Sequence, residues 1–152
     1  MRIGVWGAAA TLLLVSWSVS AAGSASLPTE TIKVETAHGA HAFSVEVAAD
    51  AASQERGLMY RDQMAADHGM LFDFHQPETV AFWMKNTKLP LDMVFIRADG
   101  TISTIAANAT PYSTKQIPSA EPVRAVLEIN GGQAGALGIH PGDHVMASMF
   151  RD

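Results

Sequence analysis

The chain contains no cysteine, and this absence excludes several kinds of chemistry at once. Without a thiol there is no disulfide framework, no cysteine nucleophile, no thiolate-ligated zinc site and no iron–sulfur cluster. Charge is also sparse, at 16% of the 152 residues, and 10 basic residues stand against 15 acidic ones. A net charge of −5 without a basic cluster disfavours binding to nucleic acid or to an anionic membrane surface.

Long apolar runs are lacking except near the N-terminus. A basic residue follows the initiator methionine, residues 5–15 are apolar, and small residues come next, which is the pattern of a secretory signal peptide. The apolar run is shorter than the roughly 20 residues that a membrane-spanning helix needs. We therefore predict a signal peptide over residues 1–22, with cleavage after Ala22 or Ala25. The mature protein is expected to be periplasmic or secreted, without stable membrane insertion.

The remaining residues have the length and pattern of one β-rich domain. Residues 23–30 are mostly small or polar and are expected to form a flexible tether, followed by a single domain over residues 31–152. The leader removes one basic residue, so the mature domain carries a net charge near 9 − 15 = −6. Short alternating apolar runs bounded by turn residues predict a mainly β fold, a compact barrel or two-sheet sandwich with one short α-helix.

Local patterns locate most of these elements. Alternation over residues 32–47, interrupted by a turn at Gly39, predicts two strands that form a hairpin. Asp50 is a favourable N-cap for a helix that we expect to end near Tyr60. An Asp-Gly turn at residues 99–100 follows a strongly apolar strand. Further strands are expected at residues 70–74, 80–84, 93–96, 101–107, 123–129 and 145–149.

The richest mixture of side-chain chemistry lies in residues 82–92, which hold the only tryptophan outside the first twenty residues. An aromatic ring beside an amide and a carboxylate is typical of a site for a sugar or a short peptide. A structural alternative stays open, in which the tryptophan is core and the polar groups satisfy backbone atoms in a proline-containing turn. The candidate ligand-binding residues are Trp83, Lys85, Asn86, Thr87 and Asp92.

Two arginines bracket the predicted end of the helix and extend this candidate site. Arg56 and Arg61 could bind an anionic ligand through their planar guanidinium groups. The structural alternative is that they complement the helix dipole and form ion pairs. Residues 108–122 contain three prolines and form a long irregular stretch, which is the pattern of a loop that could cover a cleft as a lid.

Metal and catalytic motifs give no assignment. His140 and His144 are four residues apart, but Pro141-Gly142 between them prevents helical spacing of the two ligands. Neither an HExxH motif nor a GxSxG motif occurs in the sequence. We predict no metal site and no cofactor, and the catalytic residues, if the protein is an enzyme, stay unknown.

Several blocks match a known family in order and spacing. They are Arg56–Arg61, Gly69–Phe72, Phe82–Thr87, Pro90–Asp92, Asp99–Gly100, Gly138–Ile139 and Gly142–Asp143. Over residues 31–150 the chain resembles the small exported bacterial and archaeal family called domain of unknown function 192. The resemblance implies a compact β barrel-like domain with one short helix. It implies no activity, because none is established for the family, and it assigns no role to any residue.

These observations favour a periplasmic binding or accessory module for a small polar ligand, a glycan fragment or a peptide end. Its cleft would lie around Trp83–Asp92, with Arg56 or Arg61 at the rim. One alternative is a cell-envelope hydrolase that uses Asp92 as acid or base. Another is a purely structural or interaction domain. We expect a monomer whose partner is a small ligand or an envelope component, not nucleic acid.

Overall fold

The structure is a computed structural model that describes residues 26–151. The predicted signal peptide and its cleavage positions lie outside the described residues. The strands are β1 (Thr29–Thr36), β2 (Gly39–Ala48), β3 (His68–Glu78), β4 (Ala81–Phe82), β5 (Leu91–Ile96), β6 (Ile102–Ala109), β7 (Ile117–Pro118), β8 (Val123–Asn130) and β9 (His144–Met146). The helices are α1 (Ala51–Arg56), α2 (Gln133–Leu137) and a 3-10 turn at Ser148–Phe150.

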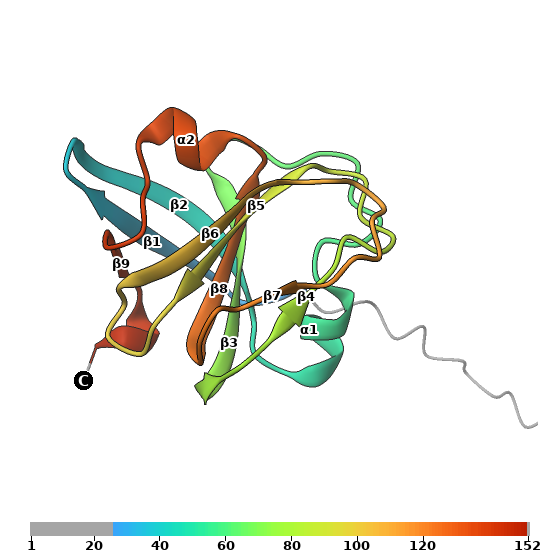
Figure 1. Ribbon diagram of the computed structural model, residues 1–152, viewed down its shortest axis with the longest axis horizontal. Coiled ribbons are helices and arrows are strands. Elements are labelled where there is room, and N and C mark those ends of the chain that lie inside the picture. The colour runs from blue at the N-terminus through green and yellow to red at the C-terminus, as the bar shows by residue number, and fades with distance from the viewer. Residues whose placement is uncertain (1–25, 152) are drawn as a thin grey trace, which may run out of the picture.

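The main sheet has seven strands in the order β6-β5-β8-β3-β2-β1-β9, and it curls into a half-barrel (Figure 1). A bridge between Thr101 and His144 joins its two edges at one corner. Strands β4 and β7 form a separate two-stranded sheet beside α1. The prediction of a mainly β fold is confirmed, but the described residues contain two short α-helices instead of one. Strand β1 begins at Thr29, two residues before the predicted domain boundary.

Both predicted hairpins form, because each has a turn residue suited to its backbone. In β1–β2, Ile32 pairs with Phe43, and Gly39 at the turn has a φ of 129°. In β5–β6, Gly100 has a φ of 84°, and a Cβ there would lie 2.8 Å from the carbonyl oxygen of Val145. Only glycine fits such a position without strain. These local signals therefore fix the two hairpins that lie at opposite ends of the sheet.

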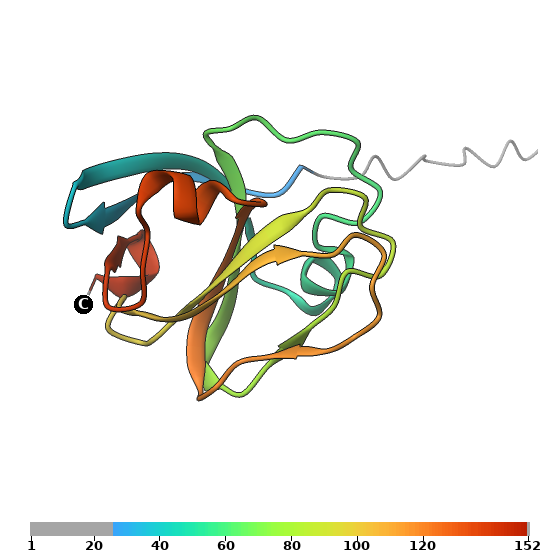
Figure 2. The ribbon, with the colours of Figure 1, turned by 45° about the horizontal axis from the view of Figure 1, so that its top comes forward.

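The centre of the sheet is apolar on both faces. All six residues of β5 are buried, as the apolar pattern of residues 93–96 predicted. One face, with Leu71, Val94 and Leu127, packs against α2 and the β1–β2 hairpin. The opposite face, with Phe72 and Phe95, is covered by the chain after α1 and by the β4 region (Figure 2). A charged residue on a central strand is therefore buried whichever way it points.

Helix α1 is shorter than predicted and is held at both ends. The Asp50 carboxylate accepts hydrogen bonds from the backbone N–H groups of Ala52 and Ser53, both at 3.0 Å. Hydrogen bonds from Ser53 keep the pKa of Asp50 below its ordinary value. The helix ends at Arg56 because Gly57 takes a φ of 47°, and a Cβ there would lie 3.3 Å from the Phe72 ring. The chain then turns across β3 instead of continuing to Tyr60.

Candidate functional site: a pocket with a buried carboxyl group

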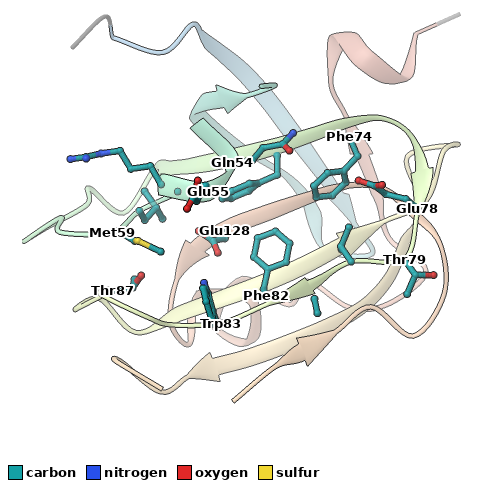
Figure 3. A pocket seen from close by; sticks show the side chains of 16 residues that line it. Gln54, Glu55, Met59, Phe74, Glu78, Thr79, Phe82, Trp83, Thr87 and Glu128 are labelled. Carbon is teal, nitrogen blue, oxygen red and sulfur yellow. The ribbon is translucent and has the colours of Figure 1, made fainter. Parts of the chain in front are cut away.

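A pocket of about 410 Å³ lies between α1, β3 and the segment that contains β4 (Figure 3). Its volume falls within the range of small-molecule sites. Its apolar wall is formed by Leu58, Met59, Phe72, Phe74, Val80, Ala81 and Phe82. Its other side chains are Gln54, Glu55, Arg56, Glu78, Thr79, Trp83, Thr87 and Glu128. The pocket therefore combines an apolar, aromatic wall with about as many polar or charged side chains.

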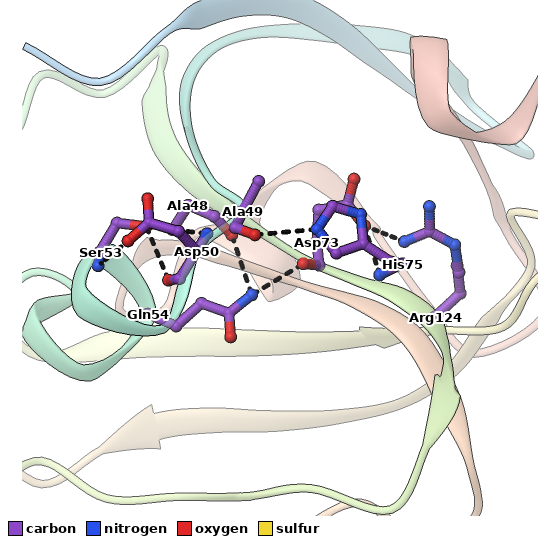
Figure 4. Close-up of polar contacts among 8 residues, drawn as sticks. All are labelled: Ala48, Ala49, Asp50, Ser53, Gln54, Asp73, His75 and Arg124. Carbon is purple, nitrogen blue, oxygen red and sulfur yellow. Dashed lines mark hydrogen bonds and ion pairs between the residues drawn. The ribbon is translucent and has the colours of Figure 1, made fainter.

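Gln54 fixes the helical wall of the pocket to the sheet. Its side-chain amide donates to the carbonyl oxygens of Asp73, at 2.7 Å, and of Ala48, at 3.3 Å (Figure 4). His75 adds a contact of 2.9 Å between its Nε2 and the carbonyl oxygen of Ala49. These bonds connect both ends of the β2–α1 connection to β3, so the helical wall is positioned by the core strand.

Asp73 is an ionised anchor next to this wall. Its carboxylate pairs with the guanidinium of Arg124 and accepts a 2.7 Å hydrogen bond from the backbone N–H of His75. Burial would raise the pKa of Asp73, but these hydrogen bonds outweigh it and hold the pKa below the ordinary value. Asp73 is therefore occupied by the scaffold, and it does not line the pocket.

Phe82 joins the pocket wall to the core. Its ring meets the rings of Phe72, Phe74 and Phe95 edge to face, with centroid distances of 5.0, 6.4 and 6.2 Å. Such edge-to-face pairs contribute about 0.5–1.5 kcal/mol each beyond their buried area. Strand β4 itself is short, because only Ala81 and Phe82 pair with β7. The aromatic cluster therefore contributes much of what holds this wall in place.

Residues 108–122 support the same wall from outside. Ser119 donates its backbone N–H to the carbonyl oxygen of Val80 at 2.8 Å, and its hydroxyl accepts the N–H of Val80 at 3.1 Å. The N–H of Met84 donates to the carbonyl oxygen of Ser113 at 2.8 Å. This segment, which the sequence suggested as a lid, is bonded along its length to the β4 region.

Glu128 lies deepest among the charged residues of the pocket. It sits on β8, opposite Met70 of β3 and Met93 of β5, and is only 4% exposed. Burial raises the pKa of Glu128 to about 8, and no hydrogen bond or charge among the described residues offsets this rise. Near pH 7 the carboxyl group is therefore mostly protonated and neutral, and it has no protein partner within residues 26–151.

Of the candidate ligand-binding residues predicted within residues 82–92, Trp83 and Thr87 line the pocket. Trp83 is 45% exposed, so the alternative that it is a core residue is wrong. The ammonium group of Lys85 lies 5.1 Å from the centroid of its ring, while Lys85 itself stays outside the pocket. Thr87 is buried and donates its hydroxyl to the carbonyl oxygen of Lys85 at 3.1 Å.

Asn86 belongs to the turn and not to the pocket lining. Its backbone has a φ of 55°, a left-handed conformation that asparagine tolerates better than most residues. Its carbonyl oxygen accepts the N–H of Tyr60 at 2.9 Å, and its side-chain amide lies 3.9 Å from the sulfur of Met59. Asn86 is therefore a turn residue, as the structural alternative has it, but its side chain contacts the sulfur of Met59 instead of a backbone group.

Asp92 also lies outside the pocket lining. Its side chain is fully buried, and its carboxylate accepts the backbone N–H groups of Asn108 at 2.8 Å, Gly132 at 2.9 Å and Ala134 at 2.8 Å. These bonds hold the start of α2, whose N-cap is a glycine without a capping side chain. A carboxylate occupied in this way is a structural anchor, so the geometry gives no support to Asp92 as acid or base.

The two candidate arginines also differ in whether they line the pocket or pair with another residue. Arg56 lines the pocket, and its guanidinium lies 5.8 Å from the centroid of the exposed Tyr60 ring. Arg61 makes two 2.6 Å hydrogen bonds to the Glu46 carboxylate, and these bonds lower the pKa of Glu46. Arg61 lines two other hollows, of about 420 and 510 Å³, instead of this pocket. The ion-pair alternative therefore describes Arg61, while Arg56 stays at the rim.

Sequence reasoning did not single out Glu128. Its alternation with apolar residues in β8 predicted a strand, but the same alternation is typical of a strand with one solvated face. Only the position of β8 between β3 and β5 shows that both of its faces are buried. The one available signal was a single acidic residue between Leu127 and Ile129.

Residues 26–151 hold no group of three or more histidine, aspartate or glutamate side chains arranged to bind a metal ion. No helix in this part of the chain is long and apolar enough to cross a membrane.

Comparisons with known proteins agree with this description of the fold. Residues 32–147 match the family model DUF192, described as uncharacterized. A Sinorhizobium meliloti 1021 protein, provisionally named a transcription regulator, is 52% identical, with a TM-score of 0.81 over 84% of this chain and 99% of that one. A Novosphingobium aromaticivorans protein of unknown function is 44% identical, with a TM-score of 0.78 over 80% of this chain and 86% of that one. No curated protein matches significantly.

Proposed function

The chain belongs to the DUF192 family of uncharacterised proteins, and from this premise we propose that it is a small-ligand binding module. Its site is the pocket between α1, β3 and β4. The observation that carries the proposal is the unpartnered Glu128 carboxyl group at a pocket of about 410 Å³ with an aromatic wall. Buried polar groups in proteins are nearly always hydrogen-bonded, so an unpartnered one that lines a pocket supports a ligand.

The half-exposed Trp83 supports the same proposal. Large apolar side chains at a rim lose contact with water when a ligand binds, and aromatic rings with a polar edge are enriched in such positions. The hydroxyl of Thr87 and the carboxyl of Glu128 supply polar groups on different elements. A ligand with an apolar body and one or two polar groups suits this arrangement better than a strongly polar sugar.

The cellular setting is part of the proposal. The N-terminal pattern of the sequence supports export, so we place the binding module in the periplasm or outside the cell. A net charge of −5 disfavours contact with DNA, so we do not propose for this chain the role that the S. meliloti relative is provisionally named for.

A second candidate is an enzyme that uses Glu128 as a general acid or base. The observation that favours it is the pKa of about 8, since a carboxyl group poised near neutral pH can both donate and accept a proton. The hydrolase hypothesis drawn from the sequence used Asp92 as the acid or base, whereas here Glu128 has that role. We favour binding, because the pocket, the half-exposed Trp83 and the Glu128 carboxyl group suit a ligand without requiring a reaction.

The binding proposal can be tested with a thermal-shift screen of the mature protein against small amphipathic compounds, sugars and short peptides. Any compound that raises the melting temperature is then titrated against Trp83→Ala and against Met146→Ala. Met146 is a suitable control because it is 40% exposed, close to the 45% of Trp83, but lies on β9 away from the pocket.

We expect Trp83→Ala to weaken binding about tenfold or more, which corresponds to about 1.4 kcal/mol, and Met146→Ala to leave it unchanged. Equal effects of both substitutions, or shifts that are insensitive to Trp83→Ala, would overturn the assignment of the pocket as the binding site.

A further inference from the structure

We infer that the ligand of this pocket is an organic cation, an amine with an apolar body whose ammonium group pairs with the carboxylate of Glu128. The inference rests on the proposed function and adds a chemical class of ligand to it. It depends on three features of the described residues: a carboxyl group without a partner, an excess of acidic groups around the pocket, and a wall of aromatic rings.

The carboxyl group is the first feature. Glu128 is 4% exposed, and no donor among residues 26–151 reaches its oxygens. The neighbouring pairs of β8 supply only methionine side chains, from Met70 and Met93. The missing donor must therefore come from water or from a ligand that enters the pocket.

The surrounding charges favour a cationic donor. Helix α1 contributes Glu55 and Arg56, β3 contributes Glu78, and β8 contributes Glu128 itself, whereas β5 presents no charged side chain to this pocket. The guanidinium of Arg56 lies over the ring of Tyr60, and Lys85 lies over Trp83 at the rim. With Glu128 neutral, the lining holds Glu55 and Glu78 against Arg56, so its net charge is −2 + 1 = −1, which favours an ammonium group over a carboxylate ligand.

The aromatic wall suits the same ligand. Phe72, Phe82 and Trp83 line the pocket, and the face of an aromatic ring attracts a cation within about 6 Å. The ammonium of Lys85, 5.1 Å from the Trp83 centroid, shows that one of these rings is already in that relation to a cation. An apolar body next to the ammonium group would fill the space beside Leu58 and Phe74.

Binding then moves one proton in a defined direction. The free Glu128 carboxyl group is mostly protonated near pH 7, because its pKa is about 8. When R–NH₃⁺ enters, the carboxyl O–H bond breaks, the proton leaves to solvent, and the carboxylate forms the ion pair with the ammonium. No other bond forms or breaks. Affinity for the amine should therefore increase as the pH rises toward 8, by close to tenfold per unit well below the pKa.

Three probes of similar shape test this directly: phenethylamine, 3-phenylpropionate and 2-phenylethanol. Their binding to the mature protein is measured by isothermal titration calorimetry at pH 6.5, 7.5 and 8.5. Buffers with different ionisation enthalpies report the number of protons released. We expect phenethylamine to bind at least tenfold more tightly than 3-phenylpropionate. Near pH 7 it should release close to one proton per molecule bound.

Glu128→Gln should weaken phenethylamine binding at least tenfold and abolish its proton release, because glutamine keeps the shape but not the charge. Met146→Ala is again the control and should change neither quantity. The proton count in the unmodified protein does not depend on how well the variant folds. Tighter binding of 3-phenylpropionate, or proton uptake with the amine, would overturn the inference.

The two proposals fail in distinguishable ways. If 3-phenylpropionate or 2-phenylethanol binds more tightly than the amine, and Trp83→Ala removes that binding, the cation inference fails and the binding proposal stands. If none of the three probes binds at millimolar concentration and the wider screen also yields no compound sensitive to Trp83→Ala, both fail.

Discussion

Two buried carboxyl groups lie on adjacent strands of the same sheet and have opposite surroundings. Asp92 of β5 pairs with Ile129 of β8, and the next pair along the two strands is Met93 with Glu128. The two carboxyl groups are thus one step apart in register, on opposite faces. Asp92 accepts three backbone N–H groups at the start of α2, whereas Glu128 faces the pocket with no partner among the described residues.

This difference separates a structural anchor from a candidate site. Asp92 replaces the capping side chain that Gly132 cannot provide, and it ties together segments up to 42 residues apart in the chain. Glu128 contributes no such connection, and its burial costs free energy in the absence of a ligand. Burial alone therefore does not show whether a carboxyl group is a structural anchor or part of a site. Its hydrogen-bond partners decide whether it stabilises the fold or marks a site.

The largest effect is expected at Asp92. Asp92→Ala leaves three N–H groups without their acceptor, and hydrogen bonds to a charged group are worth about 1.5–3 kcal/mol each. We expect a loss of at least about 4 kcal/mol in the free energy of unfolding, measured by urea denaturation. Asp92→Asn should lose less, because it keeps one acceptor oxygen.

Asp62→Ala is the matched control for this measurement. Asp62 is exposed and contacts Lys88 at 2.7 Å, so its removal should lower the free energy of unfolding far less than Asp92→Ala does. If Asp92→Ala were no more destabilising than Asp62→Ala, the contrast between the two buried carboxyl groups would disappear.

Replacement of Glu128, in contrast, should increase the stability of the protein, and the size of the increase should depend on pH. Its pKa is raised from an ordinary value of 4.5 to about 8, so the folded state keeps a proton that the unfolded chain releases. Stability should therefore fall as the pH rises from about 4.5 to 8. Glu128→Gln removes this titration. It should match the unmodified protein at pH 5 and exceed its stability by a few kcal/mol at pH 8.5, since one pKa unit corresponds to about 1.4 kcal/mol.

Urea denaturation of both proteins at a series of pH values measures this difference. Met146→Ala serves as the control, because it changes no titratable group, so its effect on stability should not depend on pH. A Glu128→Gln variant that is less stable than the unmodified protein at pH 8.5 would show that the carboxylate has a partner, and the comparison with Asp92 would break.

The sequence predicted the scaffold well because the scaffold rests on local signals. The Gly39 turn and the Asp-Gly turn at residues 99–100 determine their hairpins through backbone conformation. Alternating and continuous apolar runs located the long strands to within a few residues. Strand β4 was overestimated, because its apolar residues pack as part of an aromatic cluster and only two of them pair with β7.

The candidate site was only partly predictable. Trp83, Thr87 and Arg56 line the pocket, but the partners of Asp92 and Arg61 come from segments that no spacing rule connects to them. The burial of Glu128 depends on the position of β8 in the middle of the sheet. That position is a long-range property, since sequential strands need not be neighbours.

The smallest effect is expected for the arginines, which extend the same contrast to the surface. Arg61 makes two hydrogen bonds to Glu46, with 40% and 29% of the two side chains exposed, whereas Arg56 has no ion pair among the described residues. We expect Arg61→Met to cost about 0.5–1 kcal/mol of unfolding free energy at pH 7, and Arg56→Met to cost less than about 0.3 kcal/mol.

The pH dependence of the Arg61→Met effect distinguishes an ion pair from lost packing. The pKa of Glu46 is lowered in the folded state, so the contribution of the pair is present above the ordinary value of 4.5 and is lost as the pH falls through the lowered pKa. Urea denaturation at pH 7 and at a pH well below 4.5 should therefore show a smaller deficit of Arg61→Met in acid. A deficit of equal size at both pH values would mean that Arg61 stabilises the fold through packing of its aliphatic stem. The ion pair would then contribute nothing, and Arg61 would resemble Arg56, which has no ion pair among the described residues, more than the anchored Asp92.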